Sequence, residues 1–492
     1  MSTFKICYLS AEVAPFSGNS VLAENSHALP AALKLLEQDI RLMMPKYKSI
    51  NERKYVLREV IRLREVKVDL GGEVKLANGK TAFLPNSKVH VYFLSIPEYF
   101  DRKGVYADPQ TGKEYEDNAQ RFANFAISVL ETLKLLYWQP DIIHCNDWAT
   151  ALIPFYLKER YKDDEFFQNT RTVLTIHDFS QQGIFPLSFS SEIGIGEEFI
   201  QSGGACELEG KLNFLKTGIL YADAINVTSP EMREKLLSEP EFSQGLYPFL
   251  NERAKEVMGI LSGLDYETWN PETDQELEAN FTAKSLSSRK ENKATFCMEQ
   301  ECDPNLPLMV TVAQITHKSQ LDTLNKVFGE LAKEKIQIVL LTDESSQYFP
   351  QIEKLVKKYS KFIHLRPRLD TRHTHLLWGG ADFFFLPFLE NNDIEPVLIA
   401  LRYGVVPIVS MQNAIKDILK PFDPETEKGM GFPIPEETPE AMVKQLKKAI
   451  ATFQNAKLWS KLQKSGMRAD YSWVTSAKKY LKLYEKAAKK KR

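Results

Sequence analysis

The 492-residue sequence has no run of apolar residues long enough to cross a lipid bilayer. A membrane-spanning helix needs about 18 or more predominantly apolar residues in succession. The first residues, Met1 to Lys5, lead directly into a strand-like run and lack the apolar segment of a secretory signal peptide. We therefore expect a cytoplasmic protein that has no membrane as a partner.

Cysteine and net charge are also scarce. Five cysteines, an odd number scattered along the chain, argue against a disulfide framework. Cys297 and Cys302 are close in sequence but have no second pair and no histidine nearby, so we expect no zinc site. Lys and Arg (63) nearly balance Asp and Glu (65), which gives no electrostatic reason to expect nucleic acid as the main partner.

What the sequence does contain is an alternation of short apolar runs with helical patterns. This alternation is typical of parallel sheets built from βαβ units, and 492 residues exceed one ordinary core. The predicted fold class is α/β, with two doubly wound domains. The expected strands are residues 5–10, 141–145, 172–177, 224–228 and 257–262 in the first half, and 308–316, 336–342, 362–366, 382–387 and 405–410 in the second.

The stretch 51–99 is more irregular and is expected to add a hairpin or edge strands. Gly71-Gly72 and Asn78-Gly79 are the turn signals within it. Helical periodicity is expected over residues 117–136, 321–334 and 396–402.

The polar stretch 271–305 is expected to be a linker, because one strand series ends before it and another begins after it. It divides an amino-terminal domain, 1–270, from a carboxy-terminal domain, 306–470, and the last segment, 471–492, is expected to cross back and brace the first domain. Parallel sheets bind ligands at the carboxyl ends of their strands. Two such domains that face each other would therefore form a binding cleft.

Several segments, in order along nearly the whole chain, resemble bacterial glycogen synthases and plant starch synthases. The clearest are residues 10–16 (SAEVAPF), 140–148 (PDIIHCNDW), 175–178 (TIHD), 182–186 (QGIFP), 259–271 (GILSGLDYETWNP), 400–404 (ALRYG) and 471–473 (YSW).

The resemblance implies two Rossmann-like domains in the arrangement called GT-B. It also implies transfer of glucose from ADP-glucose to the non-reducing end of an α-1,4-glucan, with retention at the anomeric carbon and with no metal or other cofactor. Without a metal, cations and backbone N–H groups must neutralise the leaving diphosphate.

The donor-binding positions implied by the resemblance differ in this chain. Where the family carries Lys-x-Gly-Gly after the first strand, this sequence has Gly18 at the lysine and Ser20 and Val21 at the glycines. Val21 is β-branched and resists the positive φ angles that a phosphate-binding loop often needs. In the second domain Gln314 stands at an arginine position and Ser319 at a lysine position, and the neighbouring Lys318 could supply the missing charge.

Two further family positions are also altered. The slot of a catalytic-loop glutamate holds Asn391, and the preceding Glu390 could take its role if the loop is rebuilt. Glu395, which heads the next helix, is interpreted as a helix amino-terminal acid. The turn that holds the distal phosphate reads Gln412-Asn413-Ala414 and lacks glycine.

The opposite side of the expected cleft retains its chemistry. His177 ends a strand where the family has a histidine beside the reacting sugar, and Asp147 is also present. The candidate catalytic residues are therefore His177, Asp147 and Glu390, and the candidate donor-binding residues are Gly18, Gln314, Lys318, Asn391 and Asn413.

Three functional readings remain open from the sequence. The first is a glycogen or starch synthase that uses ADP-glucose. The second is a catalytically impaired relative that binds glucan or a partner synthase and regulates it, because three charged donor contacts are replaced. The third is a transferase with a different donor. The sequence does not indicate the oligomeric state.

Overall fold

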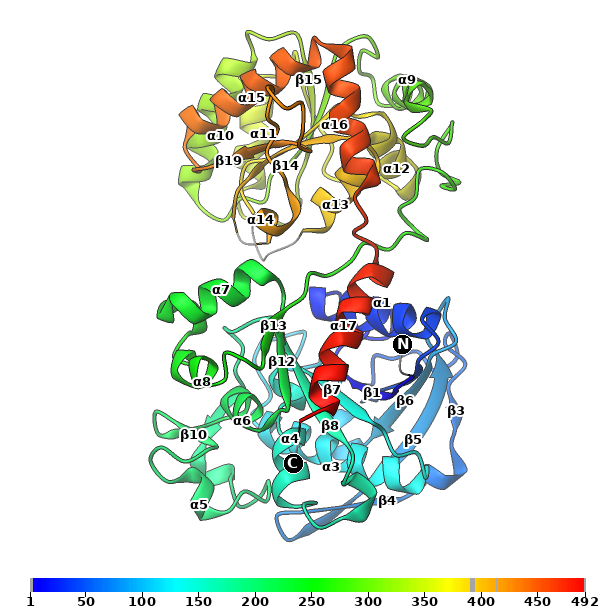
Figure 1. Cartoon of the computed structure of the whole chain (residues 1–492), viewed down its shortest axis with the longest axis vertical. Coiled ribbons are helices and arrows are strands. Elements are labelled where there is room, and N and C mark those ends of the chain that lie inside the picture. The colour runs from blue at the N-terminus through cyan, green and yellow to red at the C-terminus, as the bar shows by residue number, and fades with distance from the viewer. Residues whose placement is uncertain (1–2, 390–393, 413, 491–492) are drawn as a thin grey trace. The chain divides into compact units, whose positions relative to one another are not determined.

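A computed structural model describes residues 3–389, 394–412 and 414–490 of the chain. Two units are distinguished: the first runs up to Ser262 and includes the last stretch from Trp473, and the second comprises Gly263–Ser472 (Figure 1). The segment 271–305, expected as a linker, is thus part of the second unit. It contains the helix α9 (Arg289–Glu299), which packs against α12 (Thr371–Gly380).

The first unit is built on a twisted sheet that has ten strands among the described residues, in the order β13-β12-β8-β7-β1-β2-β6-β5-β3, with β4 paired to β5. The strands from β13 to β6 are parallel, and β5 joins them antiparallel. Their bounds are β1 (Lys5–Leu9), β2 (Asp39–Pro45), β3 (Arg58–Glu59), β4 (Val66–Leu70), β5 (Glu73–Phe83), β6 (His90–Ser95), β7 (Ile142–Asn146), β8 (Arg171–Ile176), β12 (Ala224–Val227) and β13 (Val257–Gly259).

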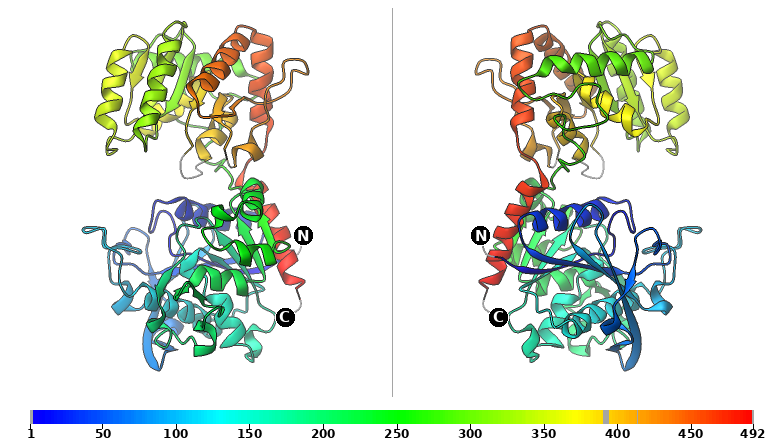
Figure 2. Two further views of the ribbon diagram at one scale, coloured as in Figure 1. Left: turned by 90° about the vertical axis from the view of Figure 1, so that its left-hand side faces the viewer. Right: turned by 90° about the vertical axis from the view of Figure 1, so that its right-hand side faces the viewer.

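Helices cover both faces of this sheet, as expected for parallel strands joined by crossovers. Two of them lie side by side: α1 and the carboxy-terminal helix α17, which reaches the sheet at β8 and β12 (Figures 1 and 2). The helices are α1 (Val21–Leu35), α2 (Pro97–Phe100), α3 (Asn118–Leu135), α4 (Ile153–Glu159), α5 (Glu197–Ile200), α6 (Phe214–Tyr221), α7 (Pro230–Ser238), α8 (Tyr247–Glu252) and α17 (Trp473–Ala488). A small sheet of β9 (Ile184–Pro186), β10 (Glu207–Leu208) and β11 (Lys211–Asn213) completes the unit.

The second unit has a parallel sheet, which among the described residues has six strands in the order β16-β15-β14-β17-β18-β19. The strands are β14 (Leu308–Val312), β15 (Gln337–Leu341), β16 (Ile363–Leu365), β17 (Phe383–Leu386), β18 (Val406–Ser410) and β19 (Phe432–Ile434). The remaining helices are α10 (Lys318–Leu331), α11 (Phe349–Lys358), α13 (Glu395–Arg402), α14 (Ile415–Ile418), α15 (Pro439–Phe453) and α16 (Ala456–Arg468). The predicted α/β class with two Rossmann-like units is confirmed.

All ten strands expected in the two halves are present, each within a few residues of its predicted bounds. The irregular stretch 51–99 differs from expectation. It contains β6, which is an interior strand because it pairs with β2 on one side and β5 on the other. Gly71 and Gly72 form the predicted hairpin turn, with φ of +61° and +81°.

The predicted turn at Asn78-Gly79 is wrong, because both residues lie inside β5. Gly79 does not reverse the chain; instead, the position has no room for a side chain. A Cβ on it would lie 2.5 Å from Leu63 Cδ1 and 2.6 Å from Leu63 Cβ. Leu63 is fully buried. Close approach between a strand and a neighbouring side chain is a recognised reason for glycine within a strand.

We expect Gly79→Ala to lower the free energy of unfolding by about 1–3 kcal/mol, the usual cost of overpacking a core. Urea unfolding followed by circular dichroism measures the change. Gly329→Ala in a helix of the second unit is the control, because its φ is not positive and the nearest atom to a Cβ there, the Tyr359 hydroxyl oxygen, lies 3.3 Å away. Equal effects of the two changes would contradict the packing explanation.

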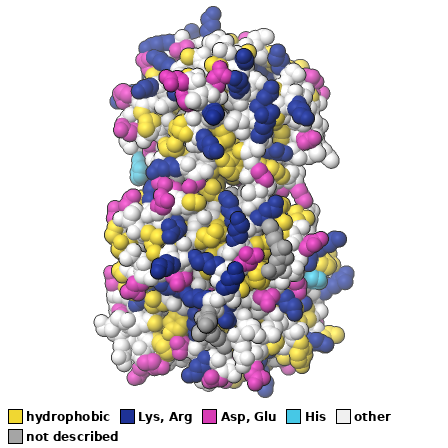
Figure 3. All heavy atoms as spheres, viewed as in Figure 1, with side chains coloured by type: hydrophobic (Ala, Val, Ile, Leu, Met, Phe, Trp, Pro, Cys, Tyr) yellow, Lys and Arg dark blue, Asp and Glu magenta, His cyan; other side chains and the backbone are white. Residues whose placement is uncertain are grey.

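Neither unit shows a membrane segment: among the described residues, no helix combines the length and apolarity needed to span a bilayer. On the face shown in Figure 3, basic and acidic side chains are interspersed.

Candidate functional site

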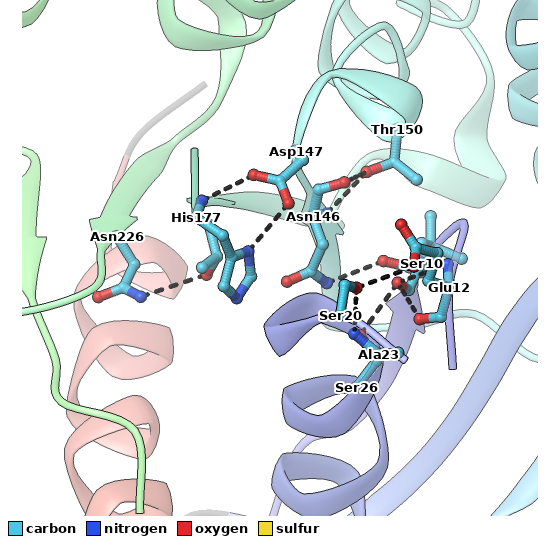
Figure 4. Close-up of polar contacts among 12 residues, drawn as sticks. Ser10, Glu12, Ser20, Ala23, Ser26, Asn146, Asp147, Thr150, His177 and Asn226 are labelled. Carbon is cyan, nitrogen blue, oxygen red and sulfur yellow. Dashed lines mark hydrogen bonds and ion pairs between the residues drawn. The ribbon is translucent and has the colours of Figure 1, made fainter. Parts of the chain in front are cut away.

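Polar side chains gather where β1, β7 and β8 end. These three strands are neighbours and parallel, so their carboxyl ends meet at one edge of the sheet. Ser10 follows β1, Asn146 ends β7 and Asp147 follows it, and His177 follows β8 (Figure 4). This edge is the candidate functional site of the first unit.

His177 is held by the carboxylate of Asp147 through two atoms. The backbone N–H of His177 donates to Asp147 Oδ1 at 2.7 Å, and His177 Nδ1 lies 3.1 Å from Asp147 Oδ2. Because an ionised carboxylate only accepts hydrogen bonds, this contact favours the neutral tautomer of His177 that carries its proton on Nδ1 and its lone pair on Nε2. Nε2 has no hydrogen-bond partner within the described part of the chain, so it is available to a ligand.

Asp147 takes an unusual backbone conformation to reach His177. Its φ is +54°, which is uncommon for a residue other than glycine and marks a position fixed by its surroundings. Its backbone N–H donates to the Thr175 carbonyl at 2.9 Å. Both side chains are mostly shielded, with 9% of His177 and 11% of Asp147 exposed, so the imidazole is constrained in orientation.

Asn146 fixes the turn that presents Asp147. Its amide Nδ2 donates to the Leu9 carbonyl at 2.8 Å, and its Oδ1 accepts from the Tyr8 hydroxyl at 3.2 Å. The Thr150 hydroxyl accepts from the Asn146 backbone N–H at 2.7 Å and donates to the Asn146 carbonyl at 2.8 Å. The turn after β7 is therefore tied to β1 by side-chain hydrogen bonds.

A buried polar network lies in the sheet beneath the site. His144 of β7 has Nδ1 2.7 Å from the Tyr484 hydroxyl of α17 and Nε2 2.7 Å from the Thr175 hydroxyl of β8. Complete burial lowers the pKa of His144 to about 3, with a smaller contribution from His177. The carboxy-terminal helix is thus hydrogen-bonded to β7, and through His144 to β8, the two strands that Asp147 and His177 follow.

The loop after β1 brings a second carboxylate to this edge. Glu12 Oε2 accepts a hydrogen bond from Ser20 Oγ at 2.8 Å, and Ser20 Oγ accepts from the Ala23 backbone N–H at 3.2 Å (Figure 4). Burial raises the pKa of the Glu12 carboxyl above its ordinary value and nearby Asp147 adds to the effect, while hydrogen bonds from Ser20 and Tyr106 oppose it.

Gly18 follows within the same loop and is exposed. Its φ is +82°, and a Cβ on it would lie 2.2 Å from Glu12 Oε2. Ser20 has an extended conformation as the cap of α1, and Val21 is the first helical residue. The expected conflict between Val21 and a positive φ therefore does not arise, since the loop places its positive φ at Gly18.

The second unit carries Gln314 and Lys318 at the carboxyl end of β14. Both are exposed, Gln314 in the loop and Lys318 as the first residue of α10. Near the end of β18, Gln412 Nε2 donates to Glu437 Oε1 at 2.7 Å and Ser410 Oγ donates to the same oxygen at 3.0 Å. The side-chain amide of Gln412 is therefore hydrogen-bonded to a carboxylate of the same unit, that of Glu437.

Three predicted residues of this unit, Glu390, Asn391 and Asn413, lie outside the described residues. Glu395 opens α13, as expected for a helix amino-terminal acid. Arg402 donates to the Asn270 side-chain oxygen at 2.7 Å, a contact within the second unit's own framework.

The structure brings two of the predicted residues, His177 and Asp147, into contact. Sequence reasoning assigned no role to Glu12, Tyr106 or Glu437. Glu12 could have been found by a simple rule, because it is a charged residue that follows a parallel strand at its carboxyl end. Glu437 carries no such signal, since its contact with Gln412 spans 25 positions.

Comparison with known proteins gives one consistent result. The family model described as the starch synthase catalytic domain matches residues 5–252. A glycogen synthase of Geotalea daltonii is 34% identical over 489 residues, which cover 99% of both chains. A glycogen synthase of Moorella thermoacetica is 32% identical, covering 99% of this chain and 98% of its own.

Solved structures extend the similarity to the fold. The catalytic domain of starch synthase IV from Arabidopsis thaliana, determined with ADP and acarbose, superposes with a TM-score of 0.83. The match covers 99% of this chain and 100% of the plant chain at 23% identity. A sucrose-phosphate synthase of Thermosynechococcus elongatus superposes with a TM-score of 0.55 at 14% identity, covering 98% of each chain.

Proposed function

Because this chain belongs to the glycogen and starch synthase family of glycosyltransferases, we propose that it transfers glucose from ADP-glucose to the non-reducing end of an α-1,4-glucan, with retention at the anomeric carbon. The observation that carries the proposal is the His177–Asp147 pair at the carboxyl edge of the first unit's sheet. The chain that contains this pair is also similar to a glycogen synthase over 99% of its length.

In this proposal the amino-terminal domain, 1–270, holds the glucan, and the carboxy-terminal domain, 306–470, holds the nucleotide. Asp147 keeps His177 oriented, so that the Nε2 lone pair can accept a hydrogen bond from a hydroxyl of the reacting sugar. Lys318, exposed at the start of α10, is the cation proposed to approach the leaving diphosphate, with Gln314 beside it as a neutral donor. Gly18, Glu390, Asn391 and Asn413 complete the proposed site.

The charges present predict a slow enzyme. An oriented donor that stabilises developing charge contributes about 3–4 kcal/mol to the barrier. Gln314 and Ser319 replace two cations implied by the resemblance, and Lys318 can supply at most one. We therefore expect Lys318→Ala to remove much of the remaining donor affinity.

The test is incorporation of labelled glucose into glycogen from ADP-glucose, with UDP-glucose and no donor as parallel reactions. Incorporation with ADP-glucose that falls at least tenfold in Lys318→Ala is the expected result. Lys326→Ala, a change further along the same helix, is the matched control. Glucan binding without incorporation from either donor would overturn the proposed activity in favour of a glucan-binding regulator, and incorporation from UDP-glucose alone would overturn the assigned donor.

A further inference from the structure

Two free cysteines, Cys297 and Cys302, meet at the carboxyl end of α9, where the chain leaves the helix through a left-handed residue. Glu301 has a φ of +55°, and the backbone N–H of Cys302 donates to the Cys297 carbonyl at 2.9 Å. This pattern is that of the Schellman motif, which brings the side chains at its two ends into contact. In this chain both of those side chains are thiols.

The separation of the two backbones suits a disulfide. A carbonyl oxygen lies about 2.4 Å from its own Cα and an amide nitrogen about 1.5 Å from its own, so the 2.9 Å hydrogen bond keeps the two Cα atoms within about 6.8 Å of each other. Disulfides usually span about 4.4–6.8 Å between Cα atoms. The two thiols also interact directly, and each is the largest influence on the pKa of the other. A disulfide can therefore form here without displacing the helix.

The two thiols differ in their access to solvent. Cys297 is 1% exposed, and its Sγ accepts a hydrogen bond from Gln337 Nε2 at 3.8 Å. Cys302 is partly exposed, and its Sγ donates to the Gln300 carbonyl at 3.9 Å. A dissolved oxidant therefore reaches Cys302 first, and Cys297 is placed to react with Cys302 alone.

The charges around Cys302 favour its thiolate, which is the form that attacks a disulfide. A hydrogen bond with the Cys297 thiol lowers the pKa of Cys302; burial opposes the shift. Arg366 and Lys293 lower this pKa further. Arg366 is fixed beside the helix end, because its Nε donates to Gln300 Oε1 at 2.8 Å and its Nη2 to the Gln300 carbonyl at 2.6 Å. The guanidinium thus also offsets the partial negative charge of the helix end, which would otherwise oppose a thiolate.

We propose that Cys297 and Cys302 are a site of reversible oxidation, at which a dissolved low-molecular-weight disulfide converts the two thiols into a disulfide bond. The Cys302 thiolate attacks one sulfur of the oxidant, forms a mixed disulfide and releases one thiolate. Cys297 then gives up its proton to a departing thiolate, attacks Cys302 Sγ and expels the second thiolate. In total the protein loses two electrons and two protons, and the oxidant takes them up as two thiols.

The experiment uses the reduced full chain, incubated with excess oxidised glutathione and then alkylated with N-ethylmaleimide in denaturant. Trypsin leaves both cysteines on one peptide, residues 294–318, because no lysine or arginine lies between Lys293 and Lys318. We expect this peptide to be two hydrogen atoms lighter and to carry no label, and we expect dithiothreitol to restore both labels. Two labels retained after oxidation would overturn the proposal and leave the pair as apolar packing.

Cys297→Ser and Cys302→Ser assign the two roles. In Cys297→Ser, Cys302 should keep a glutathione adduct, because no second thiol is placed to displace it. In Cys302→Ser, Cys297 should remain a thiol, because it is buried. Absence of the adduct in the first variant, or an adduct on Cys297 in the second, would overturn the proposed order of attack. Circular dichroism of each variant shows that it is folded.

Cys206→Ser is the matched control, because Cys206 is a buried cysteine of the first unit and its loss should leave the oxidation of peptide 294–318 unchanged. Cys7 and Cys145 are an internal control, since they lie on the neighbouring strands β1 and β7 but are fully buried. They should keep both labels, and an equal loss of labels from them would overturn the assignment of reactivity to exposure and charge. The test requires no turnover, so its outcome is independent of the transferase assay.

Discussion

His177→Ala is expected to lower kcat for glucose incorporation by about a thousandfold, within the range typical of a positioned side chain that exchanges hydrogen bonds or protons with the reacting group. The variant removes the one imidazole at this edge whose Nε2 has no partner within the described residues, while Asp147 and the strands remain. The affinity for glucan should change much less than kcat. Initial rates with labelled ADP-glucose, at several glucan concentrations, separate the two effects.

Asp147→Asn tests whether kcat depends on the orientation and tautomer of the His177 imidazole as well as on its presence. An amide at position 147 can present an N–H to His177 Nδ1 and so favour the opposite tautomer, with the proton on Nε2. We expect a loss of kcat smaller than that of His177→Ala, together with a shift in the pH profile. His90→Ala, at an exposed position of β6, is the control. A His177→Ala enzyme that retains more than a tenth of the original kcat would exclude the proposed role.

The second large effect is expected on stability at acidic pH, and it comes from His144. Its folded-state pKa is about 3, well below the ordinary value of 6.5. Below pH 6.5 the unfolded chain therefore binds a proton that the folded chain does not. The stability contributed by the neutral imidazole is complete above pH 6.5 and is lost progressively as the pH falls towards 3. The full difference is on the order of 5 kcal/mol, and about 2 kcal/mol of it is lost by pH 5.

Urea unfolding between pH 5 and 7.5 measures this dependence. In His144→Gln the part of the pH dependence due to the imidazole should disappear, although the stability at pH 7.5 also falls. Tyr484→Phe keeps the imidazole but removes its partner on α17, so we expect a loss of about 1–3 kcal/mol with the pH dependence retained. His317→Asn removes an imidazole from an exposed position and serves as the control. Identical acid dependence in the unsubstituted protein and in His144→Gln would contradict the assignment.

The sequence by itself determined the fold class and which polar residues gather at one edge of the first sheet. Apolar, β-branched runs such as those of β7 and β8 form strands wherever they are buried on both faces. Parallel strands end at a common edge, so the order of residues along the chain is enough to place Asp147 and His177, which follow β7 and β8, close together.

Only the tertiary structure decided which side chains meet across distant segments. His144 and Tyr484 are 340 positions apart, and the pairing of their side chains depends on where α17 packs. Asn78-Gly79 has the sequence of a turn, yet both residues lie in β5, where Gly79 leaves room for Leu63. The position of the Glu12 carboxylate depends on the fold of its loop, which places it in hydrogen-bond contact with Ser20 and directly beside Gly18. Local patterns report the tendency of a segment to be buried, whereas these contacts arise from the close packing of elements that the chain brings together only on folding.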